Sequence, residues 1–164
     1  MLHFSDVMAS LNVISFNMRG FRNGCNLVKV LLGQNAIIAV QEHCLRDDNL
    51  SNFRALNSSI VYYGVSGMTD QAKKGILHGR PFGGVAFVWS QSIGRFIKVV
   101  GCDTAGRCCG IKVHAGSRTV LIENVYFPCQ SQNAEYNNNN NNNHNNGYGA
   151  VIMAEPLREF TGFI

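Results

Sequence analysis

Residues 11–20 read LNVISFNMRG, a stretch that begins as a strand and ends in polar residues. Side chains from Leu11 to Phe16 alternate between two faces in a run rich in apolar and β-branched residues, which predicts a β-strand. Asn17 follows directly, and Gly20 closes the stretch. Asparagine and glycine both favour turns, so a plain turn is one interpretation of this polar exit. A phosphate-handling site at the end of a strand is the other.

The residues that follow predict a helix, a second strand and a second helix. Residues 23–33 (NGCNLVKVLLG) place apolar side chains at helical spacing and end at Gly33, a common helix terminator. Residues 36–42 (AIIAVQE) form a continuous apolar run that ends in a carboxylate, which is typical of a strand buried on both faces. Residues 46–57 (RDDNLSNFRALN) carry two aspartates near their start, where the first turn of a helix favours negative charge.

The rest of the chain up to Pro128 predicts a succession of strands. Several stretches are rich in β-branched and aromatic residues and are separated by short connections, apart from a longer loop over 66–81. These stretches are 59–65, 84–89, 96–102, 108–114 and 119–126. Two βα units followed by a meander of strands predict an α/β protein with layered sheets and helices outside them.

Beyond Pro128 this periodic pattern stops. Residues 137–146 hold nine asparagines around His144, a composition too polar and too uniform to form a packed core. The remaining residues predict one weak strand over 150–153 and a short amphipathic helix from Pro156. We therefore expect a folded portion over 1–130, an Asn-rich low-complexity linker over 131–149 and a truncated remainder over 150–164.

The charge of the chain is unevenly distributed. Residues 1–130 carry 13 basic and 7 acidic residues, a net charge of +6, whereas residues 131–164 carry 1 and 3, a net charge of −2. A mildly basic body is compatible with a polyanionic partner such as a nucleic acid, although many proteins without such a partner share it. The apolar fraction of 46% and the charged fraction of 15% are typical of a globular protein.

The apolar runs and the cysteines bear on the cellular compartment. No apolar run approaches the roughly 18 residues needed to span a membrane, and the start of the chain lacks the features of a secretory signal. We therefore expect an intracellular protein that does not bind a membrane. The cysteines form no C-x-x-C pair and no metal-binding spacing, so we expect reduced thiols there. They are Cys25, Cys44, Cys102, Cys108, Cys109 and Cys129.

Polar side chains lie at the ends of three predicted strands. Asn17 follows the first strand, Glu42 ends the second, and Tyr126 ends the last, within NVYFP. Loops at strand ends converge on one crevice in parallel or mixed sheets. Glu42 offers a hard oxygen to Mg²⁺, which keeps most of its waters and takes one or two carboxylates. Asn17 and Tyr126 would then hydrogen-bond phosphate oxygens or a catalytic carboxylate, as in a metal-assisted phosphodiester site.

Each of these residues also has a purely structural interpretation. A glutamate after a buried strand often just begins a loop, because strand ends are commonly polar. Asn17 before Gly20 serves a turn as well as a site. Tyr126, shortly before Pro128, would simply cover the edge of a sheet. The spacing of the residues alone leaves both interpretations open.

Four stretches stand in the order seen in the endonuclease/exonuclease/phosphatase superfamily: LNVISFNMRG, AIIAVQEHCL, GRPFGGVAFVW and VLIENVYFP. They most resemble the apurinic-type endonuclease domain at the front of non-LTR (LINE-type) retrotransposon polyproteins. The resemblance covers about residues 11–128. S-F-N-M-R-G paired with Q-E-H is its most specific part, and G-R-P-F-G-G over 79–84 is typical of retrotransposon members. The resemblance implies a partial four-layer α/β sandwich of the DNase I type, with this chain as its N-terminal portion.

The resemblance also implies a role for each strand-end residue. Asn17 matches the asparagine of the first motif, Glu42 the metal-binding glutamate, and Tyr126 the tyrosine that contacts the scissile phosphate. The implied reaction is hydrolysis of a DNA strand with Mg²⁺, or Mn²⁺ in its place. In a retrotransposon the nick would expose a 3′ hydroxyl that primes reverse transcription. That role implies a nuclear location for the parent element and a reverse transcriptase domain in its polyprotein.

Basic residues near these motifs are candidate contacts to DNA phosphates. Arg19 lies in the first motif, and three more basic residues lie in the long loop over 66–81. Exposed basic residues in loops more often simply keep a surface soluble. The three loop candidates are Lys73, Lys74 and Arg80.

Two motifs that the resemblance leads one to expect are missing from the sequence. The superfamily continues with G-D-x-N, whose aspartate orients or deprotonates water, and ends with S-D-H, whose histidine stabilises the transition state. Here no aspartate follows Asp103, and the one histidine after His114 is His144, inside the asparagine run. Removing one positioned catalytic group typically lowers a rate by roughly 10²–10⁴-fold. We therefore expect the chain to be inactive by itself.

Two classes of function remain open at this point. The chain is either a fragment of a retrotransposon endonuclease or a non-catalytic remnant that at most binds nucleic acid or phosphate. A phosphoesterase of the same superfamily that acts on another phosphate ester is a further alternative, because likeness of fold does not determine the substrate.

Overall fold

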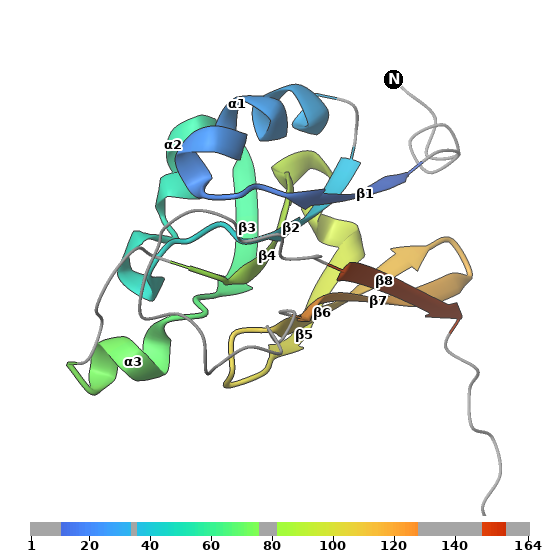
Figure 1. Cartoon of the computed structure of the whole chain (residues 1–164). Coiled ribbons are helices and arrows are strands. Elements are labelled where there is room, and N and C mark those ends of the chain that lie inside the picture. Colours follow the sequence, from blue (N-terminus) through green and yellow to red (C-terminus); the bar gives the residue numbers. More distant parts are fainter. Residues whose placement is uncertain (1–10, 34–35, 76–81, 128–148, 157–164) are drawn as a thin grey trace, which may run out of the picture.

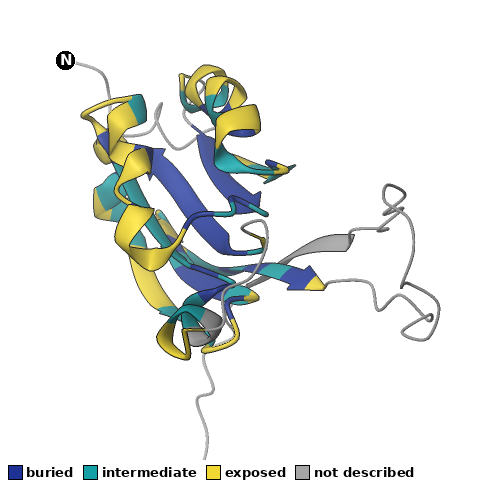
Figure 2. Cartoon of the chain, turned by 60° about the vertical axis from the view of Figure 1, so that its left-hand side comes forward, coloured by how far each residue is buried: buried dark blue, intermediate teal, exposed yellow. Residues whose placement is uncertain are grey.

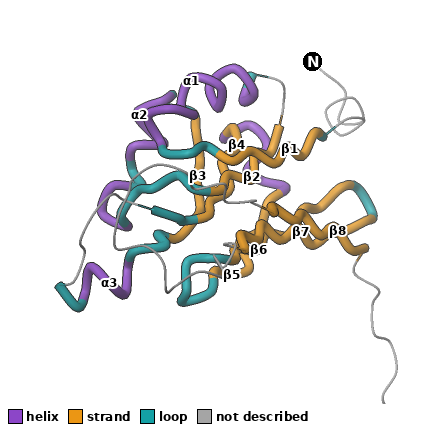
Figure 3. Tube along the Cα trace, viewed as in Figure 1, coloured by secondary structure: helices purple, strands orange, loops and turns teal. Residues whose placement is uncertain are grey.

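Two four-stranded β-sheets stack face to face, and helices cover the outer face of one of them (Figures 1 and 3). The computed structural model describes residues 11–33, 36–75, 82–127 and 149–156. One hydrophobic core lies between the helices and the first sheet, and a second lies between the two sheets. These layers of helix, sheet and sheet confirm the prediction of a partial α/β sandwich.

Sheet A contains β1 (Asn12–Asn17), β2 (Ala36–Gln41), β4 (Val85–Ser90) and β3 (Ile60–Val65), in that order across the sheet. β1 and β2 run parallel, and β4 runs antiparallel to both β2 and β3. Every residue of β2 is buried, because this strand lies between the helices on one side and the second sheet on the other (Figure 2). That position explains its continuous apolar sequence.

Helices α1 (Phe21–Leu32) and α2 (Asn52–Leu56) pack on the outer face of sheet A. Phe53 of α2 is fully buried, and its ring centroid lies 5.2 Å from that of Phe21 in α1. The other described helical segments are α3 (Thr69–Lys73) and the 3₁₀ turns η1 (Asp47–Asn49) and η2 (Gln91–Phe96). No helix in the described ranges is long and apolar enough to cross a membrane.

Sheet B is an antiparallel meander of β5 (Ile97–Cys102), β6 (Cys108–Ala115), β7 (Arg118–Phe127) and β8 (Gly149–Pro156). One face of β6 and β7 packs against β2 and β4 of sheet A. Alternate residues of β7 are therefore buried, beginning at Ile122 and continuing through Asn124 to Tyr126. The period of two along β7 is what a strand with one buried face requires.

The predicted strands between residues 11 and 126 are all confirmed, with small shifts at their ends. The helix predicted over 23–33 is confirmed as α1, and the strand predicted over 150–153 is confirmed within β8. The helix predicted over 46–57 is instead two short pieces, η1 and α2. The carboxylate of Asp47 accepts hydrogen bonds from the Ser66 amide and the Thr69 hydroxyl, so it is engaged by the chain after β3.

One further helix was not predicted, and several predicted features lie outside the described residues. Helix α3 lies inside the loop predicted over 66–81, where no apolar periodicity announced it. The asparagine tract, Arg80 and the residues after Pro156 lie outside the described residues. The boundaries predicted at 130 and 149 stay predictions.

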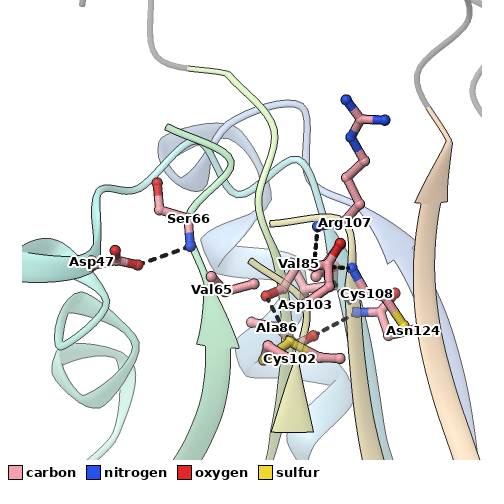
Figure 4. The surroundings of a disulfide bond; sticks show 12 residues. Asp47, Val65, Ser66, Val85, Ala86, Cys102, Asp103, Arg107, Cys108 and Asn124 are labelled. Carbon is pink, nitrogen blue, oxygen red and sulfur yellow. Dashed lines mark hydrogen bonds between the residues drawn. A yellow bond between two sulfur atoms is a disulfide. The ribbon is translucent and has the colours of Figure 1, made fainter. Parts of the chain in front are cut away.

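The cysteines differ from the expectation of reduced thiols. Cys102 and Cys109 form a disulfide between β5 and β6, so that prediction is wrong for this pair (Figure 4). The two residues are directly opposite in the strand register, with Cα atoms 4.0 Å apart. Cysteine spacing in the sequence does not reveal which residues face each other across two strands. Cys25, Cys44 and Cys108 are free thiols.

Candidate active site

A hydrogen bond between the two sheets joins two of the predicted site residues. The hydroxyl of Tyr126 donates to Oε1 of Glu42 at 2.7 Å. Glu42 directly follows β2 of sheet A, and Tyr126 is next to the last residue of β7 in sheet B. Tyr126 is buried rather than spread over a sheet edge, and Glu42 is partly buried. The fold thus brings together a carboxylate and a phenol that lie 84 residues apart in the sequence.

The backbone around Glu42 has an unusual conformation. Glu42 and Cys44 both have positive φ angles, of 51° and 53°, which are uncommon for residues other than glycine. The segment is held from both sides, because the Glu42 carbonyl accepts from the Gly20 amide at 2.8 Å and the Cys44 amide donates to the Gly83 carbonyl at 3.0 Å. Residues held in such sparsely populated regions cluster at functional sites. The conformation is therefore consistent with a site at Glu42.

Asn17 lies next to this segment and also forms a turn. It ends β1 and is the register partner of Gln41, the residue before Glu42. Its Oδ1 accepts a hydrogen bond from the Arg19 amide at 2.9 Å, so the turn interpretation is correct for this side chain. The turn and a site are compatible, because the turn holds Asn17 at the carboxyl end of β1. A role in binding phosphate stays a prediction.

Two buried polar side chains that were not predicted as site residues lie close in sequence to Glu42 and Tyr126. Gln41 and Asn124 are both fully buried, and Nε2 of Gln41 donates to Oδ1 of Asn124 at 2.6 Å. Gln41 directly precedes Glu42, and Asn124 lies two residues before Tyr126 in β7. The signal for Asn124 was available, because it shares the alternation of Ile122 and Tyr126 and so faces the core.

His43 is a buried neutral base that was also not singled out. Its Nδ1 accepts from the Leu45 amide at 3.0 Å, which leaves the protonated Nε2 to donate to the Val65 carbonyl at 3.2 Å. Burial lowers the pKa of His43 to about 4, and the Val65 carbonyl and the charge of Asp47 oppose this only in part. A neutral imidazole with both nitrogens engaged supports the loop after Glu42 rather than reacting.

An arginine that the sequence analysis did not consider lies at the same edge of the sandwich. Oδ1 of Asp103 accepts from the amides of Arg107 and Cys108, at 2.8 and 2.9 Å, which closes the turn between β5 and β6. The Arg107 carbonyl accepts from the Tyr126 amide at 2.8 Å, so the two residues are neighbours. The Arg107 side chain is exposed and extends away from the disulfide (Figure 4). The turn thus presents a cation beside Tyr126.

The predicted basic contacts are placed unevenly. Arg19 is exposed in the turn after Asn17, close to the segment that carries Glu42. Lys73 ends α3 and lines a separate cavity of about 200 Å³ together with Arg46 and Asp47. Lys74 is exposed directly after that helix, and Arg80 lies outside the described residues. Among the described candidates, Arg19 is the one that the geometry brings near Glu42.

The carboxylate of Glu42 suits a magnesium site better than a closed zinc site. Within the described ranges, no group of three or more His, Cys, Asp or Glu side chains is gathered together. A closed zinc site needs about four such ligands. Mg²⁺ instead takes one or two carboxylates and completes its shell with water and substrate phosphate. The carboxylate of Glu42, with one oxygen bonded to Tyr126, fits a hard cation of this second kind.

Comparisons with known proteins add one solved structure. No family model matches the sequence, and no curated protein matches it. Among solved structures, the chain is similar to a 3′ phosphatase, NExo from Neisseria, that was determined as a variant bound to a product DNA hairpin. The match has a TM-score of 0.44 and 17% sequence identity, and it covers 68% of this chain. This chain spans 40% of the length of that protein.

Proposed function

We propose that residues 11–127 form the N-terminal portion of a Mg²⁺-dependent endonuclease site of the endonuclease/exonuclease/phosphatase superfamily, with DNA as its substrate. The observation that carries this proposal is the hydrogen bond of 2.7 Å from the Tyr126 hydroxyl to the Glu42 carboxylate. Two residues that the resemblance assigns to the metal and to the phosphate meet across the two sheets.

Within the proposed site each residue has a distinct task. Glu42 holds the cation, with Mn²⁺ as a substitute for Mg²⁺, and Tyr126 orients the Glu42 carboxylate and contacts the scissile phosphate. Asn17, held at the end of β1 by its turn, contacts a phosphate oxygen. The cation, when bound, stabilises negative charge on the phosphate and on the leaving oxygen.

DNA is the proposed substrate because of the basic residues near this site. The body of the chain carries a net charge of +6, and Arg19 and Arg107 are exposed next to Asn17 and Tyr126. Contacts between basic side chains and the phosphates of the DNA backbone supply most of the affinity for DNA without reading its sequence. By its resemblance, the parent protein is a LINE-type polyprotein with a reverse transcriptase domain, which nicks nuclear DNA to prime reverse transcription.

The chain by itself is proposed to bind but not to cut. Its sequence contains neither G-D-x-N nor S-D-H, so the groups that activate water and stabilise the transition state have no counterpart. Loss of even one such group lowers a rate by roughly 10²–10⁴-fold. This observation also favours the second candidate function, a non-catalytic remnant that binds nucleic acid. A phosphoesterase for another phosphate ester is the third, because the described residues do not select a base or a sugar.

Binding of Mn²⁺, followed by electron paramagnetic resonance, tests the proposed site directly. The full 164-residue chain should bind Mn²⁺, and Glu42→Ala should abolish that binding. Glu123→Ala is the matched control, because Glu123 lies on the outward-facing side of β7 and should leave binding unchanged. Equal binding by the wild type and Glu42→Ala would overturn the proposal.

A plasmid-nicking assay with Mg²⁺ then separates the candidate functions. We expect no nicking by the chain alone, and nicking when a segment with in-frame G-D-x-N and S-D-H motifs is fused after Ile164. Nicking by the chain alone that disappears in Glu42→Ala would overturn the non-catalytic candidate. Absence of both motifs from every reading frame of the neighbouring DNA would overturn the endonuclease-fragment candidate.

A further inference from the structure

A chain of buried hydrogen bonds connects the two sheets through residues that lie close in sequence to Glu42 and Tyr126. Nδ2 of Asn124, in sheet B, donates to the carbonyl oxygens of Val40 and Ala86 in sheet A, at 2.9 and 3.0 Å; Figure 4 shows the bond to Ala86. Oδ1 of the same side chain accepts from Nε2 of Gln41 at 2.6 Å. Asn124 and Gln41 are both fully buried. We call Gln41 and Asn124 the amide clamp, and the exposed Ser15 is its contact in β1.

The amide clamp reaches all three strands that carry predicted site residues. Nε2 of Gln41 also lies 3.2 Å from Oγ of Ser15 in β1. Ser15 precedes Asn17 by two residues and Asn124 precedes Tyr126 by two, and residues two apart share a face of a strand. Gln41 directly precedes Glu42. Every member of the clamp is therefore one or two residues from a member of the site.

Apolar packing between the sheets lacks the directionality of these hydrogen bonds. Ile122 is buried on the same face of β7 as Asn124, and it packs in the core between the sheets. Apolar contact resists separation of the two surfaces but has no preferred direction. Hydrogen bonds lose strength steeply when distance and angle depart from their narrow range. The amide clamp thus adds a directional resistance to sliding of one sheet over the other.

From these contacts we propose that Asn124 and Gln41 are positioning residues. They hold sheet B in the position relative to sheet A at which the Tyr126 hydroxyl reaches the Glu42 carboxylate. The catalytic meaning of this role rests on the proposed function, whereas the positioning itself does not. Neither residue touches the substrate or the cation in this proposal. Their effect passes entirely through the Glu42–Tyr126 hydrogen bond.

The experiment reads that hydrogen bond by NMR in protein labelled with ¹³C at tyrosine Cζ. The Tyr126 signal is assigned with Tyr126→Phe, and the readout is the change in its chemical shift caused by Glu42→Gln. In otherwise wild-type protein we expect a clear change, because the phenol loses its carboxyl partner. In the Asn124→Leu background, which retains volume but removes the amide, we expect that change to be lost.

A matched control separates positioning from general stability. Ile122→Ala removes buried volume from the same face of β7 and should lower stability, yet the response of Tyr126 to Glu42→Gln should persist. Gln41→Met keeps the length of the side chain without its donor, and it serves as the second clamp variant should Asn124→Leu fail to fold. We expect the response to be reduced in Gln41→Met, because Asn124 keeps its two bonds to sheet A there.

The outcomes are unambiguous for the proposal. A response of undiminished size in the folded clamp variants would overturn it, and so would a response that is lost equally in Ile122→Ala. Failure of the proposed function would show instead as equal Mn²⁺ binding by the wild type and Glu42→Ala. The NMR response does not depend on any metal, so the two failures are distinguishable.

Discussion

Gly84 and His43 pack so closely that a Cβ atom at Gly84 would lie 2.4 Å from Cε1 of the imidazole. Gly84 also has a φ angle of +88°, a region that other residues rarely adopt. Gly84 directly precedes β4 and lies beside the buried imidazole of His43, which supports the segment after Glu42. The glycine is therefore needed twice, for its backbone and for the space it leaves.

This relationship predicts a large effect of Gly84→Ala. A positive φ costs about 1–2 kcal/mol for a residue with a Cβ, and forced overpacking adds about 1–3 kcal/mol. Gly116→Ala is the control, because Gly116 has a φ of +63° but no atom within 4 Å of the added Cβ. Urea unfolding followed by circular dichroism should show a loss for Gly84→Ala that clearly exceeds that for Gly116→Ala. Equal losses would mean that contact with His43 is not limiting.

The buried His43 predicts a dependence of stability on pH. Its pKa is lowered to about 4 in the folded protein, chiefly by burial, from 6.5 in the unfolded chain. Between these values the unfolded chain binds a proton that the folded protein does not, so stability falls as the pH falls from 6.5 towards 4. The full effect is about 3 kcal/mol.

Unfolding midpoints in urea across this pH range measure the effect of His43. His43→Gln, which retains an amide donor and acceptor, should lose this part of the pH dependence. His114→Gln should keep it, because His114 is exposed and bonds only to Thr119 among the contacts described. An unchanged slope in His43→Gln would contradict a histidine that is neutral when folded.

The disulfide between Cys102 and Cys109 predicts a stabilisation that a reductant removes. Closing a loop with a sequence separation of 7 restricts the unfolded chain, which corresponds to about 2–3 kcal/mol in the chain-entropy model. Thermal melting with and without a phosphine reductant should show a lower midpoint for the reduced wild type. The double variant Cys102→Ala/Cys109→Ala should melt near that lower midpoint and ignore the reductant. A reductant effect of equal size in the double variant would trace it to another disulfide.

Arg107 predicts a contribution to DNA binding that salt screens. Its loop is tied to the Tyr126 backbone, and a single phosphate contact contributes about one unit to the slope of log affinity against log salt concentration. Fluorescence anisotropy with a short DNA duplex should give a weaker affinity and a shallower slope for Arg107→Ala. Arg118→Ala is the control, because Arg118 begins β7 at the end of the strand away from Tyr126. Equal effects of both variants would indicate only a loss of net charge.

Much of the fold was predictable because its signals are local. The run from Ala36 to Gln41 is apolar at every position, and its burial on both faces follows from its place between helices and a second sheet. The strands of sheet B were predictable from their β-branched residues, which is also a local signal. Helix α3 has only five residues and no apolar stripe, so no periodicity could reveal it.

The site was predictable only in part, because its contacts are not local. Glu42 and Tyr126 could be chosen as polar residues at strand ends, but their hydrogen bond depends on how two sheets stack. Asn124 was overlooked because an amide within a strand is more often exposed, and only its alternation with Ile122 places it in the core. The pairing of Cys102 with Cys109 likewise needs the register of β5 and β6.

The pairing of β7 with β8 has a consequence for how this gene can vary. Phe127 and Gly149 are partners in that ladder, so the two ends of the intervening segment are anchored side by side. In general, the free energy of closing a flexible loop rises by only about 0.6 kcal/mol for each doubling of its length. Replication slippage in the asparagine codons would therefore lengthen or shorten the repeat while both strands keep their register. Copies of this gene that differ in repeat number should encode the same sandwich.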